Sequence, residues 1–285
     1  MFMASKVAVV EFEGSVQKSF ERALELIGRI DDLNTSKRSV VIKVGVFDPE
    51  DENHTTVSVV DAIIRGFSKA PQIFLAESDN YRGKGSERLQ IWKELFSERV
   101  VPFNLSDDTE TKKVKLTDEE MRLSHILFKP NVFVSSHVLR GFERGSVLKN
   151  LFGLVPDPKK AKFHKKLDKL LPDIYEAVGG IDLAVIDGTF LYRGPGARPP
   201  AASERAKYRV KMNTLLVGRD AIAVETVGAV LAGLKPEKMP VLQEAVKRGL
   251  GEGNLENIKI LGSSFEDVEE KFSAAVESLK RKRVE

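Results

Sequence analysis

The sequence predicts an α/β protein in which a mostly parallel sheet is flanked by helices in a three-layer, Rossmann-like arrangement. Short β-branched runs alternate along the chain with helix-length amphipathic segments, which is the order expected when crossover helices join parallel strands. The chain has 285 residues, of which 42% are apolar. It is therefore long and apolar enough to bury a large core.

Each expected strand is a short apolar run. The strands in chain order are residues 7–12, 40–46, 72–77, 100–105, 132–136, 183–186, 214–217 and 258–261. Amphipathic segments predict helices at 16–30, 56–68, 86–98, 159–178, 221–231, 240–248 and 265–282. We expect residues 1–285 to form one domain. The polar stretch 107–120 predicts an excursion from the sheet and is the alternative boundary between two lobes.

Composition narrows the class of protein. The chain contains no cysteine, so its own thiolates cannot hold an iron-sulfur cluster or zinc, and any divalent metal must bind His, Asp, Glu, carbonyls or water. Forty-five basic side chains nearly balance 42 acidic ones, so nucleic acid is not the expected partner. No apolar stretch reaches the length of a membrane span, which predicts a cytoplasmic protein without a membrane partner. The high charge suits a thermophile, and a homo-oligomer is compatible with the sequence.

Polar residues at strand ends are the first candidates for a site, because ligands of open parallel sheets bind where the strands end. Lys43 lies inside the apolar run VVIKVGV, and a buried ammonium needs a partner or a bound phosphate. The alternative is a lysine that reaches solvent at a sheet edge. Thr55 and Thr56 follow this strand and are candidate ligand-binding residues, although capping of the next helix is the favoured explanation for them.

The densest group of chemically capable residues lies between residues 132 and 164. It contains two of the four histidines, His137 and His164, together with Lys149 and Asn150. Imidazoles can ligate a borderline metal or transfer protons, and lysine and asparagine can bind phosphate or carboxylate oxygens. The alternative is that the histidines are structural. The lysine-rich segment 159–169 is interpreted as an amphipathic helix with a solvated face rather than an anion site.

Two acidic residues complete the candidate set. Asp187 ends a strand before a loop rich in Gly, Pro and Ala that includes Gly194, the usual place for a metal ligand or general base. Its alternative role is to cap its own turn. Glu225 lies on an otherwise apolar helix, where an ionised carboxylate needs a partner. Both are candidate metal ligands, and the loop 194–203 is a candidate lid that contributes Gly194 to ligand binding.

Several motifs occur in the order found in the domain of unknown function 362 family, which the chain resembles. They are VVIKVGV, the Thr55–Thr56 pair, IFLAESD, SHVLRGFERGSVLKNLFG with His164, VIDGTFLYRGPG, LVGRDAIAVETVG and GLG. Together they span about residues 38 to 251. Some members of this family are fused to ferredoxin-type modules. The resemblance therefore implies that a separate iron-sulfur protein is a candidate redox partner for this chain. The chain departs from the pattern at Val44, where proline is common, and at Glu225, where aspartate is usual.

The spacing of His137, Lys149 and His164 is more remotely similar to that of nickel-pincer lactate racemases. That likeness implies residues that hold a pyridinium-type cofactor and shuttle protons. Two hypotheses follow for the function. In the first, an enzyme binds an anionic small molecule, with or without a divalent metal: Lys43 and Lys149 clamp the anion, and the histidines act as ligands or acid–base groups. In the second, a non-catalytic carrier or scaffold delivers a ligand or cofactor and acts with a separate redox partner.

Overall fold

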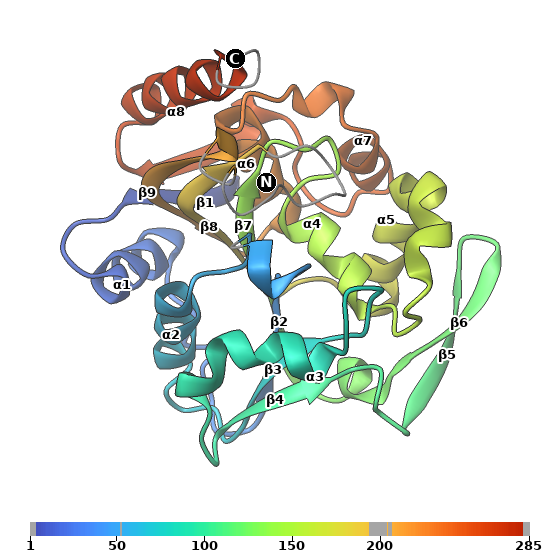
Figure 1. Ribbon diagram of the computed structural model, residues 1–285. Helices are drawn as coiled ribbons and strands as arrows, with labels where there is room; N and C mark the ends of the chain where they lie inside the picture. The colour runs from blue at the N-terminus through green and yellow to red at the C-terminus, as the bar shows by residue number, and fades with distance from the viewer. Residues whose placement is uncertain (1–3, 52, 194–203, 205–206, 282–285) are drawn as a thin grey trace.

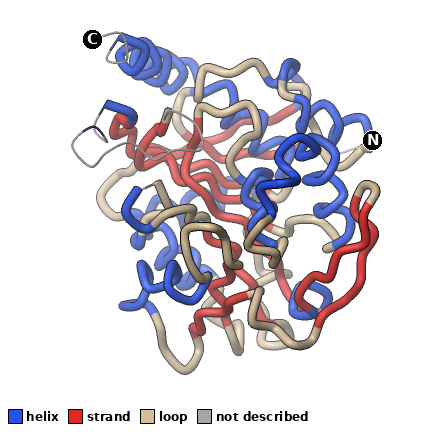
Figure 2. The backbone as a smooth tube through the Cα atoms, turned by 45° about the vertical axis from the view of Figure 1, so that its right-hand side comes forward, coloured by secondary structure: helices blue, strands red, loops and turns tan. Residues whose placement is uncertain are grey.

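An eight-stranded sheet runs through the middle of the protein, with helices against both faces (Figure 1, Figure 2). The computed structural model describes residues 4–51, 53–193, 204 and 207–281. The strands are β1 (Ser5–Glu11), β2 (Ser39–Val44), β3 (Ile73–Glu77), β4 (Val100–Asn104), β5 (Thr111–Leu116), β6 (Glu119–Ser124), β7 (Asn131–Arg140), β8 (Leu183–Tyr192), β9 (Arg209–Gly218) and β10 (Ile258–Gly262). The α-helices are α1 (Val16–Ile27), α2 (Val57–Gly66), α3 (Gly85–Arg88), α4 (Val147–Asn150), α5 (Leu167–Ala177), α6 (Ala221–Leu231), α7 (Pro240–Lys247) and α8 (Phe265–Arg281).

The predicted mostly parallel sheet is confirmed. Its strands lie in the order β10-β1-β9-β8-β7-β2-β3-β4. β9 runs antiparallel to its neighbours β1 and β8, and the other pairs of this sheet are parallel. The chain leaves β2 to build β3 and β4 on one side, and later adds β7 on the other side of β2. The order of the strands therefore reverses at β2, the kind of position where open α/β sheets bind ligands.

Two apolar cores cover the two faces of the sheet. One packs α1 and α2 against side chains such as Ile42 and Val134. The other packs α4 to α8 against side chains such as Val41 and Phe133. Neighbouring residues of a strand point to opposite faces, so Lys43 shares the face of Val41 and lies under the layer of α4 to α8.

The expected elements differ from the structure mainly at their ends. Residues 86–98 form the short helix α3 followed by the 3₁₀ helix Leu89–Leu95, and 159–178 form the 3₁₀ helix Lys160–Lys166 followed by α5. β8 and β9 are longer than expected and pair with each other. Residues 107–120 include β5 and the turn of the β5–β6 hairpin, which lies apart from the main sheet. A division into lobes stays a prediction. In the described ranges no helix is both long and apolar enough to cross a membrane.

Candidate functional site

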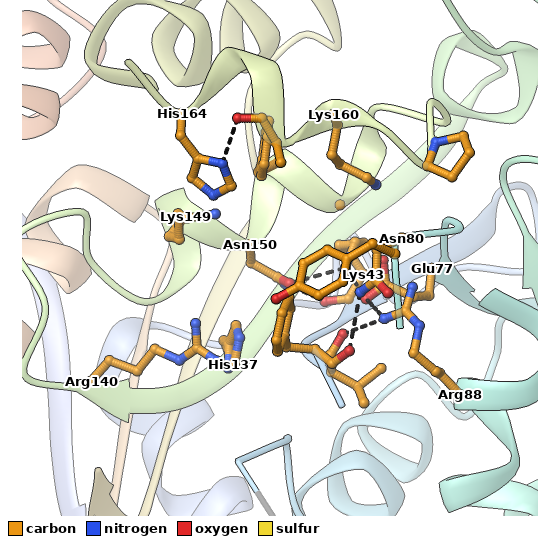
Figure 3. Close-up of a pocket in the computed structure, with 17 residues that line it drawn as sticks. Lys43, Glu77, Asn80, Arg88, His137, Arg140, Lys149, Asn150, Lys160 and His164 are labelled. Atoms are coloured by element: carbon orange, nitrogen blue, oxygen red, sulfur yellow. Dashed lines mark hydrogen bonds and ion pairs between the residues drawn. The ribbon is translucent and has the colours of Figure 1, made fainter. Parts of the chain in front are cut away.

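A pocket of about 100 Å³ lies at the carboxyl ends of β2 and β3, beside β7 (Figure 3). The 3₁₀ helices Leu151–Leu154 and Lys160–Lys166 and helix α4 complete its walls. The volume is several times what one water molecule needs. Its lining residues are Lys43, Val46, Phe47, Glu77, Asn80, Tyr81, Arg88, His137, Arg140, Lys149, Asn150, Phe152, Gly153, Pro158, Lys160, Ala161 and His164.

A buried ion pair forms the floor of the pocket. Lys43 is 1% exposed, and its Nζ lies 3.0 Å from Oε2 of Glu77. A guanidinium nitrogen of Arg88 lies 3.6 Å from the same oxygen. Burial alone would raise the pKa of Glu77, but Lys43, Arg88 and Lys160 outweigh burial and lower it. Burial lowers the pKa of Lys43, and Glu77 offsets part of that effect. The carboxylate is therefore ionised and already shared between two cations.

Asn150 joins the ion pair to the sheet. Its Oδ1 accepts a hydrogen bond from Nζ of Lys43 at 3.0 Å. Its Nδ2 donates to the carbonyl of Lys43 at 2.7 Å, to Oγ of Ser135 at 3.1 Å and to the carbonyl of Ser136 at 3.2 Å. This one side chain at the end of α4 thus connects β2 with β7. The interaction explains why a lysine can lie inside an otherwise apolar strand, since its ammonium has three acceptors.

Lys160 corrects the expectation that the lysine-rich segment 159–169 has only a solvated face. Lys160 is 6% exposed, and its Nζ donates hydrogen bonds to Oγ of Ser78 and the carbonyl of Val155, each at 2.6 Å. Burial lowers the pKa of Lys160 to about 8. The segment turns inward here because it forms a 3₁₀ helix rather than the predicted α-helix, and the tighter winding changes which residues share a face.

Lys149 differs from the other lysines of the pocket. Among the described residues its ammonium has no hydrogen-bond or ion-pair partner, and it lies 4.3 Å from the centre of the Phe152 ring. Lys149 is half-buried. Burial is the main cause that lowers its pKa to about 7, and Arg140 and Arg144 contribute in the same direction. A large fraction of Lys149 is therefore an uncharged amine at neutral pH.

His137 lies neutral against the sheet. Its Nδ1 accepts a hydrogen bond from the backbone N–H of Val138 at 2.7 Å, so the proton of the ring is on Nε2. Burial lowers its pKa well below the usual range, with Arg140 and Lys43 adding to the effect. A histidine that ligates a metal usually donates its second nitrogen's proton to an acceptor. His137 has the opposite arrangement, which suits an N–H donor to a ligand oxygen better than a metal ligand.

His164 has the other tautomer. Its Nδ1 lies 2.8 Å from the carbonyl of Ala161, which can only accept, so Nδ1 carries the proton and Nε2 keeps a lone pair. Its ring packs edge-on against Phe152 with 5.2 Å between ring centres. Burial lowers the pKa of His164, and the hydrogen bond to Ala161 offsets part of this effect. His164 is thus a neutral base on the same aromatic ring that Lys149 contacts.

Two glycines allow this close packing. A Cβ atom at Gly45 would lie 2.3 Å from the ring of His137. A Cβ atom at Gly153 would lie 2.4 Å from Cε of Lys43 and 2.7 Å from Oε1 of Glu77. Such distances are well inside van der Waals contact, so any larger residue would displace the ion pair or the imidazole.

Asp187, Thr55 and Thr56 belong to a structural contact outside the pocket. Oδ2 of Asp187 accepts hydrogen bonds from the backbone N–H and Oγ1 of Thr56, both at 2.7 Å, and Oδ1 accepts from the N–H of Thr189 at 2.9 Å. Thr56 begins α2, but its side chain bonds Asp187 instead of capping the helix. Thr55 donates from Oγ1 to the carbonyl of Ser136 at 3.0 Å. These contacts fasten the start of α2 to β7 and β8.

Glu225 holds the beginning of the short helix α4. Its carboxylate accepts hydrogen bonds from the backbone N–H groups of Ser146 at 2.7 Å and Leu148 at 2.8 Å. Burial raises its pKa to about 7, although these backbone hydrogen bonds act to lower it. The partner that a buried carboxylate requires is therefore the backbone of α4, the helix that carries Lys149 and Asn150. Glu225 supports the pocket from behind and does not line it.

The structure thus gathers His137, His164, Lys43, Lys149 and Asn150 around one pocket, whereas Thr55, Thr56, Asp187 and Glu225 do not line it. The proposed metal ligands do not gather: in the described ranges no three His, Asp or Glu side chains form a group that could hold a metal ion. Gly194 and the whole candidate lid, residues 194–203, lie outside the described residues. The predicted metal, catalytic and ligand-binding roles stay predictions.

Sequence reasoning missed several lining residues. Arg88 is 2% exposed, and its guanidinium donates to the carbonyls of Val46 and Ser78. It stands in a segment that reads as an ordinary amphipathic helix, so no local signal marks it. Phe152 contacts both Lys149 and His164. The only feature of the sequence that marks it is its position in the motif KNLFG.

The fold and the pocket define a class: a mostly parallel α/β protein with a cation-rich pocket where the order of its strands reverses. The family model described as domain of unknown function (DUF362) matches residues 40–230, and the chain belongs to this family. No curated protein gives a match. The family segment contains β2, β3, β7 and α4 and therefore every lining residue of the pocket.

Proposed function

We propose that the pocket at the ends of β2, β3 and β7 binds a small anionic molecule. The proposal rests on the charges of the side chains that line the pocket. The described lining contains five lysine and arginine side chains and one carboxylate, that of Glu77. Since Lys43 and Arg88 already share Glu77, the pocket keeps an excess of positive charge, which an anion would neutralise.

Lys149 is the residue that gains most from a bound anion. Its ammonium has no hydrogen-bonding partner among the described residues, and burial lowers its pKa to about 7. An oxyanion beside Nζ would favour the charged form and raise this pKa. Binding is therefore expected to draw a proton onto Lys149 at about pH 8. His137, with its Nε2–H, and Lys160 add hydrogen-bond donors on other walls of the pocket.

A divalent metal ion fits these residues less well. The surrounding cations would repel it, and His137 has the hydrogen-bond arrangement of a donor rather than a ligand. The same pocket would serve an enzyme or a non-catalytic carrier, and stoichiometric binding without turnover of any substrate would favour the carrier. A cytoplasmic location and a homo-oligomer remain predictions from composition.

Calorimetric titration of the full chain with inorganic phosphate and with glycolate tests the proposal. Lys149→Met is expected to weaken binding of the anion that binds by at least about tenfold, because a charge-assisted hydrogen bond contributes about 1.5 to 3 kcal/mol. Lys112→Met is a matched control, since Lys112 also lies over an aromatic ring, 4.5 Å from the centre of Phe128, but outside the pocket. Failure of both anions to bind the wild-type chain, or equal losses in both variants, would contradict the proposal.

A further inference from the structure

The amine of Lys149 is placed for covalent chemistry as well as for charge. Lys43 and Lys160 both donate hydrogen bonds to protein acceptors. Lys149 donates none to any described residue, and its Nζ lies 4.3 Å from the centre of the Phe152 ring. Of the three lysines in the pocket, it is the one whose nitrogen lone pair can reach a ligand without first breaking a hydrogen bond.

A neutral base lies on the same ring. His164 contacts Phe152 edge-on with 5.2 Å between ring centres, and its bond to the Ala161 carbonyl leaves the lone pair on Nε2. Lys149 also contributes to the lowered pKa of His164, which places the two groups within electrostatic range. A weakly solvated lysine beside other cations, with a base at hand, is the arrangement by which proteins activate an amine as a nucleophile.

We propose that Lys149 forms an imine with a small anion that carries an aldehyde or ketone, such as a 2-oxo acid, and that His164 moves the proton this reaction requires. The inference rests on the proposed anion site, because the remaining cations would hold the carboxylate of the substrate. The substrate class follows from the two kinds of group present: cations for the anion and a nucleophilic amine for the carbonyl carbon.

The reaction balances with one proton taken from solvent. The lone pair of Nζ attacks the carbonyl carbon, a C–N bond forms, and the C–O π electrons move to oxygen. Nε2 of His164 takes a proton from the nitrogen and returns it to this oxygen. His164 then passes a second proton from solvent to the hydroxyl group, the nitrogen lone pair forms the C=N bond as the C–O bond breaks, and water leaves. A protonated imine remains on Lys149, and one proton from solvent has been consumed. The face of Phe152 favours that cation, as it favours other cations placed over an aromatic ring.

Reductive trapping on the full chain tests the inference. Glyoxylate is the probe, since it is the smallest oxo acid, and sodium cyanoborohydride converts its imine into a stable amine that peptide mass spectrometry locates. At neutral pH we expect Lys149 to be modified at least about tenfold faster than Lys112, an exposed lysine on β5, because its lowered pKa of about 7 leaves much of its amine unprotonated. We expect His164→Gln to slow modification of Lys149 and not that of Lys112.

Glycolate separates the two proposals, because it has the size of glyoxylate but no carbonyl carbon for the amine to attack. If glycolate binds and depends on Lys149 while glyoxylate modifies Lys149 no faster than Lys112, the imine is refuted and the anion site stands. If neither compound binds, the imine is refuted, and failure of phosphate as well would refute the anion site. Selective modification of Lys149 that excess glycolate slows supports both.

Discussion

Replacing Lys149 with methionine is expected to make the protein more stable while it weakens anion binding. Burial lowers the pKa of Lys149 from 10.5 to about 7, so the folded protein holds an ammonium less favourably than the unfolded chain does. At about 1.4 kcal/mol per pKa unit, this difference corresponds to about 5 kcal/mol as an upper limit. Solvent reaches the half-buried side chain, so the expected gain in unfolding free energy is about 2 kcal/mol.

The lowered pKa of Lys149 also predicts how the unfolding free energy changes with pH. The unfolded chain keeps the proton of Lys149 up to about pH 10.5, and the folded protein keeps it only up to about 7. Between these values the unfolded state binds more protons, so the stability of the wild-type protein rises with pH. The destabilisation by Lys149 is complete below about pH 7. The advantage of Lys149→Met should therefore be largest at about pH 6 and much smaller at about pH 9.5.

Urea unfolding of wild type, Lys149→Met and Lys112→Met at these two pH values measures the effect. Methionine is unbranched, keeps most of the length of the side chain and can contact the Phe152 ring through sulfur, so loss of the charged group is the main change. Lys112→Met should change stability by less than about 0.5 kcal/mol, as surface substitutions usually do. If Lys149→Met is less stable than wild type at both pH values, or its advantage does not shrink as pH rises, the amine is not desolvated as the structure indicates.

Three further predictions concern the surroundings of the pocket. Glu77→Gln leaves Lys43 without its carboxylate and should cost about 3 to 5 kcal/mol in urea unfolding, whereas Glu110→Gln, which breaks only surface ion pairs, should cost less than about 1 kcal/mol. Gly153→Ala places a Cβ atom 2.4 Å from Cε of Lys43, so it should cost about 1 to 3 kcal/mol and weaken phosphate binding in calorimetry. Asp187→Asn should lower the melting temperature through loss of the Thr56 contacts and leave phosphate affinity unchanged, and a large loss of affinity would place Asp187 in the site.

The fold class was predictable because its signals are local. The apolar runs that became β1, β2 and β3 and the amphipathic spacing that became α1 and α2 are read from neighbouring residues. The ends of β8 and β9 were missed for the same reason, since stretches such as RVKMN are not apolar runs. These stretches extend as strands because each pairs with the other, and pairing between distant segments leaves no local pattern.

The candidate site was predictable in part. Lys43 was selected because it interrupts an apolar run. His137, Lys149, Asn150 and His164 were selected because they form a dense group of chemically capable residues, and all five side chains line the pocket. Asp187 was selected because it ends a strand. It lies one residue beyond Ile186, a side chain of the core under α4 to α8, so strand alternation turns it to the opposite face of the sheet. Proximity to a strand end was a sufficient reason to suspect these residues but did not decide which face they occupy.

The sequence by itself determined the class of fold, the absence of thiolate chemistry and two of the five lysine and arginine side chains that line the pocket, Lys43 and Lys149. Only the tertiary structure decided which charges neutralise one another. Lys43 and Asn150 are 107 residues apart in the chain, and Glu77 joins them from a third segment. Because desolvation and charge pairing act through space at a few ångströms, they cannot be read from sequence neighbours. Lys149 has no hydrogen-bond or ion-pair partner among the described residues, and burial lowers its pKa. Both proposals depend on this feature.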